Sequence, residues 1–180
     1  MPVICGLYEI GIINRFRDYD DLDTYATKSG VEGLLIGKDA SDFMAFFGCE
    51  IRNPFEGSCF RMGMILDNNR GEPVLCSVHG NASIAIGMNS AVVVVDVASR
   101  RVVQSIRLDS IFHHLLCNQK VLVAVHELGA RILKLPNLEE IADTFCEIVA
   151  DAVLSDSELV LTSADEEVIR VDLVPRLVNP

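Results

Sequence analysis

Two segments of the chain match each other without gaps. Residues 114–135 (HLLCNQKVLVAVHELGARILKL) lie over residues 152–173 (AVLSDSELVLTSADEEVIRVDL). Each segment reads as a short apolar strand, a polar turn, a second strand, a second polar turn and a third strand. The match therefore predicts a tandem array of one β unit rather than a single irregular domain.

Further copies lie upstream. Ala91–Val97 precedes its counterpart, Gly129–Leu135, by the same displacement, and the strand before it, Ser83–Gly87, needs a one-residue shift to align. A degraded fourth copy is expected from Leu34 through Phe43–Phe47 to residues 62–66. We therefore predict a single domain, 1–180, in which blade-like repeats fill residues 31–173. An N-terminal strand and an acidic segment occupy residues 1–30.

Central strands such as Val121–Val125 and Val92–Val95 are apolar at consecutive positions, which indicates that both of their faces are covered. Strongly polar or Pro-containing turns separate the units. A fourth strand of each unit is expected at Pro73–Val78, Val102–Leu108 and Ile141–Ile148, the last of which also fits a short helix.

Four strands per unit, a period of about 38 residues and apolar central strands resemble β-propeller blades, broadly of the WD40-like kind. The resemblance covers Val31–Leu173. It lacks the Gly-His and Trp-Asp dipeptides of that family, and the chain contains no tryptophan. It implies an all-β fold, a small or partial propeller of four to five short blades. A β-sandwich with internal repeats is the alternative.

The chain length makes closure of the ring a question, because an open row of blades leaves apolar sheet faces in water. Either the N-terminal strand Ile4–Phe16 completes the last blade and closes the ring, or two chains pair as a homodimer. No apolar stretch is long enough to span a bilayer. Six scattered cysteines lack metal-site spacing, and the start lacks a signal-like core, so we expect a cytoplasmic protein with reduced thiols.

Negative charge is concentrated near the C-terminus. The whole chain carries −11, and residues 139–172 hold eleven acidic residues against one basic residue, Arg170, which gives −10. Such a surface repels phosphate backbones and favours a basic protein partner, so no nucleic-acid or membrane partner is expected. The plainer interpretation is a solvated face whose acidity aids solubility.

A second acidic run, residues 15–25, precedes the repeats. It does not fit a calcium loop, because Leu22 and Asp23 stand where the fifth and sixth loop positions need an oxygen ligand and a glycine. Asp23 is expected to cap a short helix, and Tyr19 and Tyr25 are candidate surface anchors for a partner.

Motifs for nucleophilic catalysis and phosphate binding are missing from the sequence. The adjacent His113 and His114 would point to opposite faces of a strand, so they do not suit one metal ion. We therefore expect no enzyme activity, no cofactor and no metal.

The hypothesis that follows is a non-enzymatic, acidic protein-binding module. Its sharpest version is an inhibitor or immunity-type protein that neutralises a basic partner such as a toxin nuclease. A small-ligand or carbohydrate-active propeller and a structural assembly subunit are the alternatives. The candidate partner-binding residues are Asp18, Tyr19, Asp20, Asp21, Asp23, Tyr25, Glu139, Glu140, Asp143, Asp165, Glu166 and Glu167.

Overall fold

The computed structural model describes residues 3–5, 7–11, 13–27, 33–37, 44–67, 71–78 and 82–174. Within them lie one helix and a series of strands. In chain order these are β1 (Val3–Cys5), β2 (Tyr8–Ile10), β3 (Asn14–Phe16), α1 (Tyr19–Thr27), β4 (Leu34–Gly37), β5 (Met44–Asn53), β6 (Ser58–Asp67), β7 (Val74–Val78), β8 (Ser83–Met88), β9 (Ala91–Asp96), β10 (Arg101–Arg107), β11 (Phe112–Cys117), β12 (Val121–His126), β13 (Gly129–Lys134), β14 (Glu139–Phe145), β15 (Val149–Leu154), β16 (Glu158–Ser163) and β17 (Val168–Asp172).

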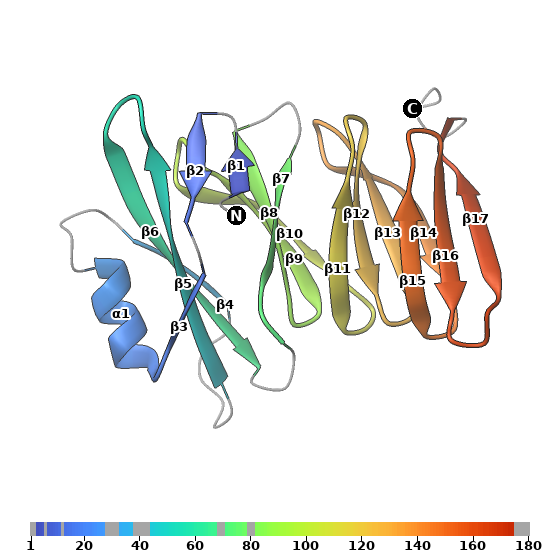
Figure 1. Cartoon of the computed structure of the whole chain (residues 1–180), viewed down its shortest axis with the longest axis horizontal. Coiled ribbons are helices and arrows are strands. Elements are labelled where there is room, and N and C mark those ends of the chain that lie inside the picture. Colours follow the sequence, from blue (N-terminus) through green and yellow to red (C-terminus); the bar gives the residue numbers. More distant parts are fainter. Residues whose placement is uncertain are drawn as a thin grey trace.

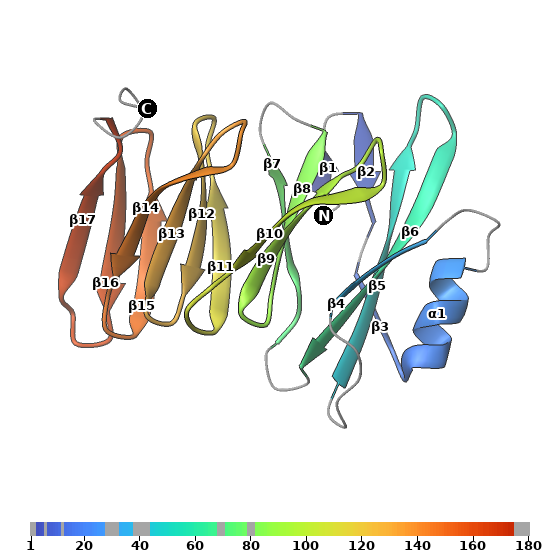
Figure 2. The ribbon, with the colours of Figure 1, turned by 180° about the vertical axis from the view of Figure 1, so that it is seen from behind.

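The strands form four sheets that stand side by side in a row, with α1 at one end and β17 at the other (Figures 1 and 2). The first sheet has the order β1-β2-β5-β6-β4, with β3 also paired to β5. The second runs β10-β9-β8-β7, the third β11-β12-β13-β14 and the fourth β15-β16-β17. The fold is an all-β partial propeller rather than the two facing layers of a sandwich.

The repeat period is constant across the second and third sheets. β8 and β12 begin at Ser83 and Val121, and β9 and β13 begin at Ala91 and Gly129. In both cases the separation is 38 residues, the same as between residues 114 and 152. The starts of β10 and β14, Arg101 and Glu139, are also 38 residues apart. The one-residue shift expected for the strand at Ser83 is therefore wrong, because the strand begins and ends in register with its counterpart.

Central strands confirm the expected double-sided burial. β8 and β12 are buried along their whole length, because the neighbouring sheets cover both of their faces. β16 instead alternates: Leu159 and Leu161 are buried, while Val160 between them is partly exposed. The fourth sheet therefore packs one face on the third sheet and turns the other outward.

The N-terminal segment does not close a ring. The single strand predicted for Ile4–Phe16 is three short strands, and β2 and β3 both pair with β5 in the first sheet. The degraded copy predicted from Leu34 also differs from a blade, because β4 runs parallel to β6. Helix α1 lies between β3, which pairs with β5, and β4, which pairs with β6, so it carries the chain from one edge of the β5–β6 hairpin to the other.

Helix α1 starts at a different cap from the one predicted. The Asp18 carboxylate accepts the Asp21 backbone N–H at 2.9 Å, whereas Asp23 lies within the helix. Leu22 and Ala26 are buried against the first sheet. The strand or helix predicted at 141–148 is β14, which begins two residues earlier and ends at Phe145. No helix among the described residues is long and apolar enough to cross a membrane.

Candidate functional site

The acidic residues predicted near the N-terminus lie on α1, at the end of the row farthest from β17 (Figure 1). Arg17 partly neutralises them. Its guanidinium lies 2.9 Å from the Asp18 carboxylate and 3.6 Å from that of Asp21. The backbone N–H of Asp21 and the Arg17 guanidinium lower the pKa of Asp18. Part of the negative charge at the start of the helix is therefore balanced by Arg17 of the same chain.

Both predicted tyrosine anchors contact the first sheet. The ring of Tyr25 lies 4.8 Å from that of Phe16 and under the guanidinium of Arg61, also at 4.8 Å. Burial raises the pKa of Tyr25 to about 12. Tyr19 is more exposed and meets Phe46 edge to face. Of the two side chains, Tyr19 therefore has more surface available for a partner.

Two adjacent connections at one end of the third and fourth sheets form the strongest candidate surface. One is the loop between β14 and β15, and the other is the turn between β16 and β17. The Ala164 N–H donates to the Ile148 carbonyl at 2.9 Å and joins the two. We call this surface the C-terminal rim, defined by Phe145, Glu147, Ile148, Asp165, Glu166 and Glu167; it lies at the lower edge of Figure 1.

The turn of the rim is held by Ser163. Its Oγ accepts the Glu167 N–H at 3.1 Å, its carbonyl accepts the Glu166 N–H at 3.0 Å, and its own N–H donates to the Glu167 carbonyl at 2.9 Å. A turn with this many internal hydrogen bonds holds its exposed carboxylates in place before a partner arrives, which reduces the entropy lost on binding.

Two large apolar side chains of the rim point into solvent, Phe145 at 68% exposure and Ile148 at 55%. Ile148 has φ of +38°, a conformation that branched side chains rarely adopt. Exposed apolar residues surrounded by charge are typical of protein-binding sites. Sequence reasoning missed both, because their apolar character indicated a buried strand.

All charged side chains of the rim are acidic. Burial raises the pKa of the Cys146 thiol, and the nearby carboxylates of Glu167 and Glu147 raise it further. Each of the two connections thus places one carboxylate, Glu147 or Glu167, near the Cys146 thiol. The sequence has no lysine, arginine or histidine between residues 135 and 169 to offset them.

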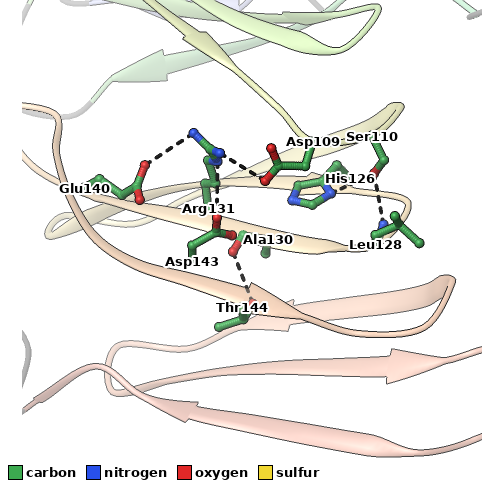
Figure 3. A network of polar contacts seen from close by, with 9 residues as sticks. All are labelled: Asp109, Ser110, His126, Leu128, Ala130, Arg131, Glu140, Asp143 and Thr144. Carbon is green, nitrogen blue, oxygen red and sulfur yellow. Dashed lines mark hydrogen bonds and ion pairs between the residues drawn. The ribbon is translucent and has the colours of Figure 1, made fainter.

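Two of the three acidic residues predicted on β14 form ion pairs with an arginine of the neighbouring strand, β13. The Arg131 guanidinium lies 3.0 Å from the Asp109 carboxylate and 3.5 Å from those of Glu140 and Asp143 (Figure 3). The carboxylates outweigh burial and raise the pKa of Arg131. Of the three acidic residues predicted on β14, only Glu139 has no ion pair among the described residues.

His126 and Ser110 lie beside this network (Figure 3). His126 is buried at 2% exposure, its Nδ1 is 2.8 Å from the Ser110 Oγ, and that oxygen accepts the Leu128 N–H at 3.1 Å. Burial lowers the pKa of His126. These hydrogen bonds link the loop before β11 to the turn after β12. We therefore assign His126 and Ser110 a structural role.

Four cavities among the described residues are lined by few acidic side chains. Their volumes are about 450, 500, 140 and 390 Å³, and each contains at most one carboxylate. The described residues contain no group of three or more His, Cys, Asp or Glu side chains arranged to hold a metal ion.

Comparisons with known proteins support the fold alone. No protein family and no curated protein matches the sequence. The computationally designed protein Ika4 is similar in structure, with a TM-score of 0.52, 13% identity, and coverage of 79% of this chain and 98% of Ika4. A chain of the mitotic checkpoint complex matches with a TM-score of 0.50 and 14% identity, over 72% of this chain and 47% of that one. These similarities agree with propeller-like repeats of β-sheets.

Hsv2 of Kluyveromyces lactis matches at 14% identity with a TM-score of 0.48, over 72% of this chain. This chain spans 42% of the length of that protein.

Proposed function

We propose that this chain is a protein-binding module whose C-terminal rim receives a basic, amphipathic surface of a partner protein. The observation that carries the proposal is the combination of exposed Phe145 and Ile148 with the carboxylates of two joined connections. Apolar side chains at the centre of an interface supply most of its binding energy, and surrounding charges select and steer the partner.

The concentration of charge supports a basic partner. Residues 139–172 carry −10 of the total −11, and Arg131 and Arg170 engage carboxylates outside the rim. A field of one sign accelerates encounter with a protein of opposite sign and repels nucleic acid. The sharpest form of the proposal is an inhibitor that covers the active-site cleft of a basic enzyme, such as a toxin nuclease.

The small-ligand alternative requires two or three carboxylates that converge on a pocket. The four cavities described above each contain at most one. The exposed apolar side chains of the rim favour a macromolecular partner over a small ligand.

The test compares two groups of carboxylates of equal charge. One variant changes Asp165, Glu166 and Glu167 to Asn, Gln and Gln, and its matched control changes Asp20, Asp21 and Asp23 of α1 to Asn. A basic amphipathic peptide with alternating lysine and leucine serves as the probe, with binding followed by calorimetry and by amide chemical shifts. We expect the rim variant to weaken binding about tenfold or more, and the helix variant to change it less than twofold.

A second pair of variants tests the apolar part. Phe145→Ser and Ile148→Ser together should abolish the chemical-shift changes at the rim while keeping the native circular dichroism spectrum. Binding should also weaken between 50 and 300 mM salt, because exposed charges are screened. Equal losses in the rim and helix variants, or binding independent of salt, would overturn the proposal. The same variants can then be applied to any natural partner.

A further inference from the structure

Two cysteines meet at the junction of the second and third sheets. Cys76 lies on β7 and Cys117 ends β11, and these two strands lie side by side (Figures 1 and 2). Both side chains pack against the same core cluster, and their thiols are in hydrogen-bond contact with each other. The two residues are far apart in the sequence and belong to no C-x-x-C motif, so only folding brings them together.

The hydrogen bond makes the two thiols unequal. It is the largest cause that raises the pKa of Cys76, and burial adds to it. Cys76 therefore holds its proton, and this proton stabilises a thiolate on the Cys117 sulfur. The thiolate is the form of cysteine that attacks a disulfide. Both side chains are partly exposed, so a small reagent can reach them, and Cys117 is the sulfur that we expect to react first.

The contact is short enough for a disulfide. Two sulfur atoms in a hydrogen bond need to approach by about 2 Å or less to reach the length of an S–S bond, which is a movement on the scale of a side chain. Cys5 is the other thiol near Cys76. It is completely buried, and its Sγ donates to the Ser83 carbonyl at 3.0 Å. Cys117 rather than Cys5 is therefore the accessible partner of Cys76.

We propose that Cys76 and Cys117 form a disulfide between the second and third sheets when the protein meets a small-molecule disulfide such as oxidised glutathione. The Cys117 thiolate attacks one sulfur of the reagent, expels one thiolate and becomes a mixed disulfide. The Cys76 thiol then loses its proton to solvent, its sulfur attacks the Cys117 sulfur, and the second thiolate leaves. In total, two protein thiols are oxidised and one reagent disulfide is reduced to two thiols.

The disulfide ties β11 to the second sheet at both of its ends. At the start of the strand, the Phe112 N–H already donates to the Asn89 carbonyl at 2.8 Å. At its end, the new bond closes residues 76–117 into one covalent loop. Such a loop lowers the entropy of the unfolded chain, so the folded state gains stability. We expect the melting temperature to rise by about 5 °C or more on oxidation.

The main test treats the folded native protein with oxidised glutathione, blocks the remaining thiols and maps the disulfides by peptide mass spectrometry. We expect the link between Cys76 and Cys117 to exceed any other cysteine pair about tenfold or more, because thiols held in contact have a high effective concentration. The melting temperature should rise with the link and return when the protein is reduced. The same treatment in urea that unfolds the chain should give mixed pairs, since folding selects this one.

Serine variants separate the two steps of the reaction. Cys76→Ser removes the second thiol, so the reaction should stop at a glutathione adduct on Cys117, and oxidation should not raise the melting temperature. Cys117→Ser removes the first attacking sulfur, so Cys76 should be modified several-fold more slowly than Cys117 is in Cys76→Ser. The control is Cys59→Ser, which removes another partly exposed thiol and should keep the full response. Circular dichroism confirms that each variant is folded.

A native protein in which Cys76 and Cys117 end as two separate glutathione adducts, or in which Cys76 is linked mainly to Cys5, would overturn the proposal. So would loss of the response in Cys59→Ser. Disulfide mapping of the native protein decides the matter even if a serine variant fails to fold. The disulfide goes beyond the proposed rim function and does not depend on it, because neither thiol belongs to the rim. Either proposal can therefore fail while the other stands.

Discussion

Phe112, on the first strand of the third sheet, packs its ring against Gly87 of the second sheet, where a Cβ atom would overlap the ring. The Phe112 N–H also donates to the Asn89 carbonyl at 2.8 Å. One residue thus joins two neighbouring sheets through both its backbone and its side chain. The absence of a side chain at position 87 sets how closely the two sheets approach.

Gly87→Ala should therefore destabilise the protein by about 1–3 kcal/mol, because the added methyl group overpacks a buried contact. Urea unfolding monitored by circular dichroism measures the loss. Phe112→Leu in the same background shortens the ring and should recover part of the stability. If the double variant is less stable than the sum of the single changes predicts, the contact is not the cause.

Ile148→Asn should raise stability by about 1 kcal/mol and weaken partner binding at the same time, because asparagine adopts a positive φ more readily than a branched residue. Ile148 has φ of +38° and 55% exposure, so its backbone is strained and its side chain contributes little to the core. Thermal unfolding and binding of the lysine–leucine peptide measure the two effects. Ile106→Asn, at a buried position of β10, is the contrasting control and should destabilise strongly.

Stability should fall as pH decreases from 7.5 to 5.5. Burial lowers the pKa of His126 and of His114 below the usual 6.5, so the unfolded chain takes up protons before the folded one does. The contribution is complete above pH 6.5 and is lost as pH falls through the lowered pKa values. Melting temperatures measured at several pH values give the slope.

His126→Asn keeps a polar group near Ser110 but cannot titrate, so it should flatten this slope. His114→Asn removes the other histidine whose pKa burial lowers, so the double variant should flatten the slope further. A His126→Asn variant with the native slope would place the titrating group elsewhere.

Arg131→Gln should cost about 1–2 kcal/mol in low salt, although the exposure of its partners limits the effect. The change leaves the carboxylates of Asp109, Glu140 and Asp143 to repel one another. The loss should shrink in 0.5 M salt, which screens the repulsion. Arg170→Gln removes one exposed pair and should cost about 0.5 kcal/mol or less. Equal losses for the two variants would contradict a special role for the Arg131 network.

The repeat could be predicted because its signal lies within each unit. Runs such as Val92–Val95 and Val121–Val125 are apolar at every position, which requires cover on both faces, and the structure provides it. The first sheet could not be predicted in the same way. Its pairing depends on α1 crossing from β3 to β4, and no local pattern specifies that β4 runs parallel to β6.

The candidate site was predicted only in part. Acidic residues are visible in any sequence, so Asp165, Glu166 and Glu167 were found, but the sequence did not show that Glu140 and Asp143 are held by Arg131. Phe145 and Ile148 were missed for the opposite reason. Apolar residues near the end of a strand are normally buried, but Phe145 ends β14 with its side chain exposed, and the loop after it exposes Ile148.

The constant spacing of the second and third sheets also has a consequence for how such a chain can change in length. Duplicating or deleting one whole repeat unit keeps every strand beside a counterpart of its own kind. An insertion of any other length must be absorbed within a single turn. Gene duplication can therefore lengthen this fold one sheet at a time, while the end sheets, with α1 on one and the alternating β16 in the other, remain suited to contact with water.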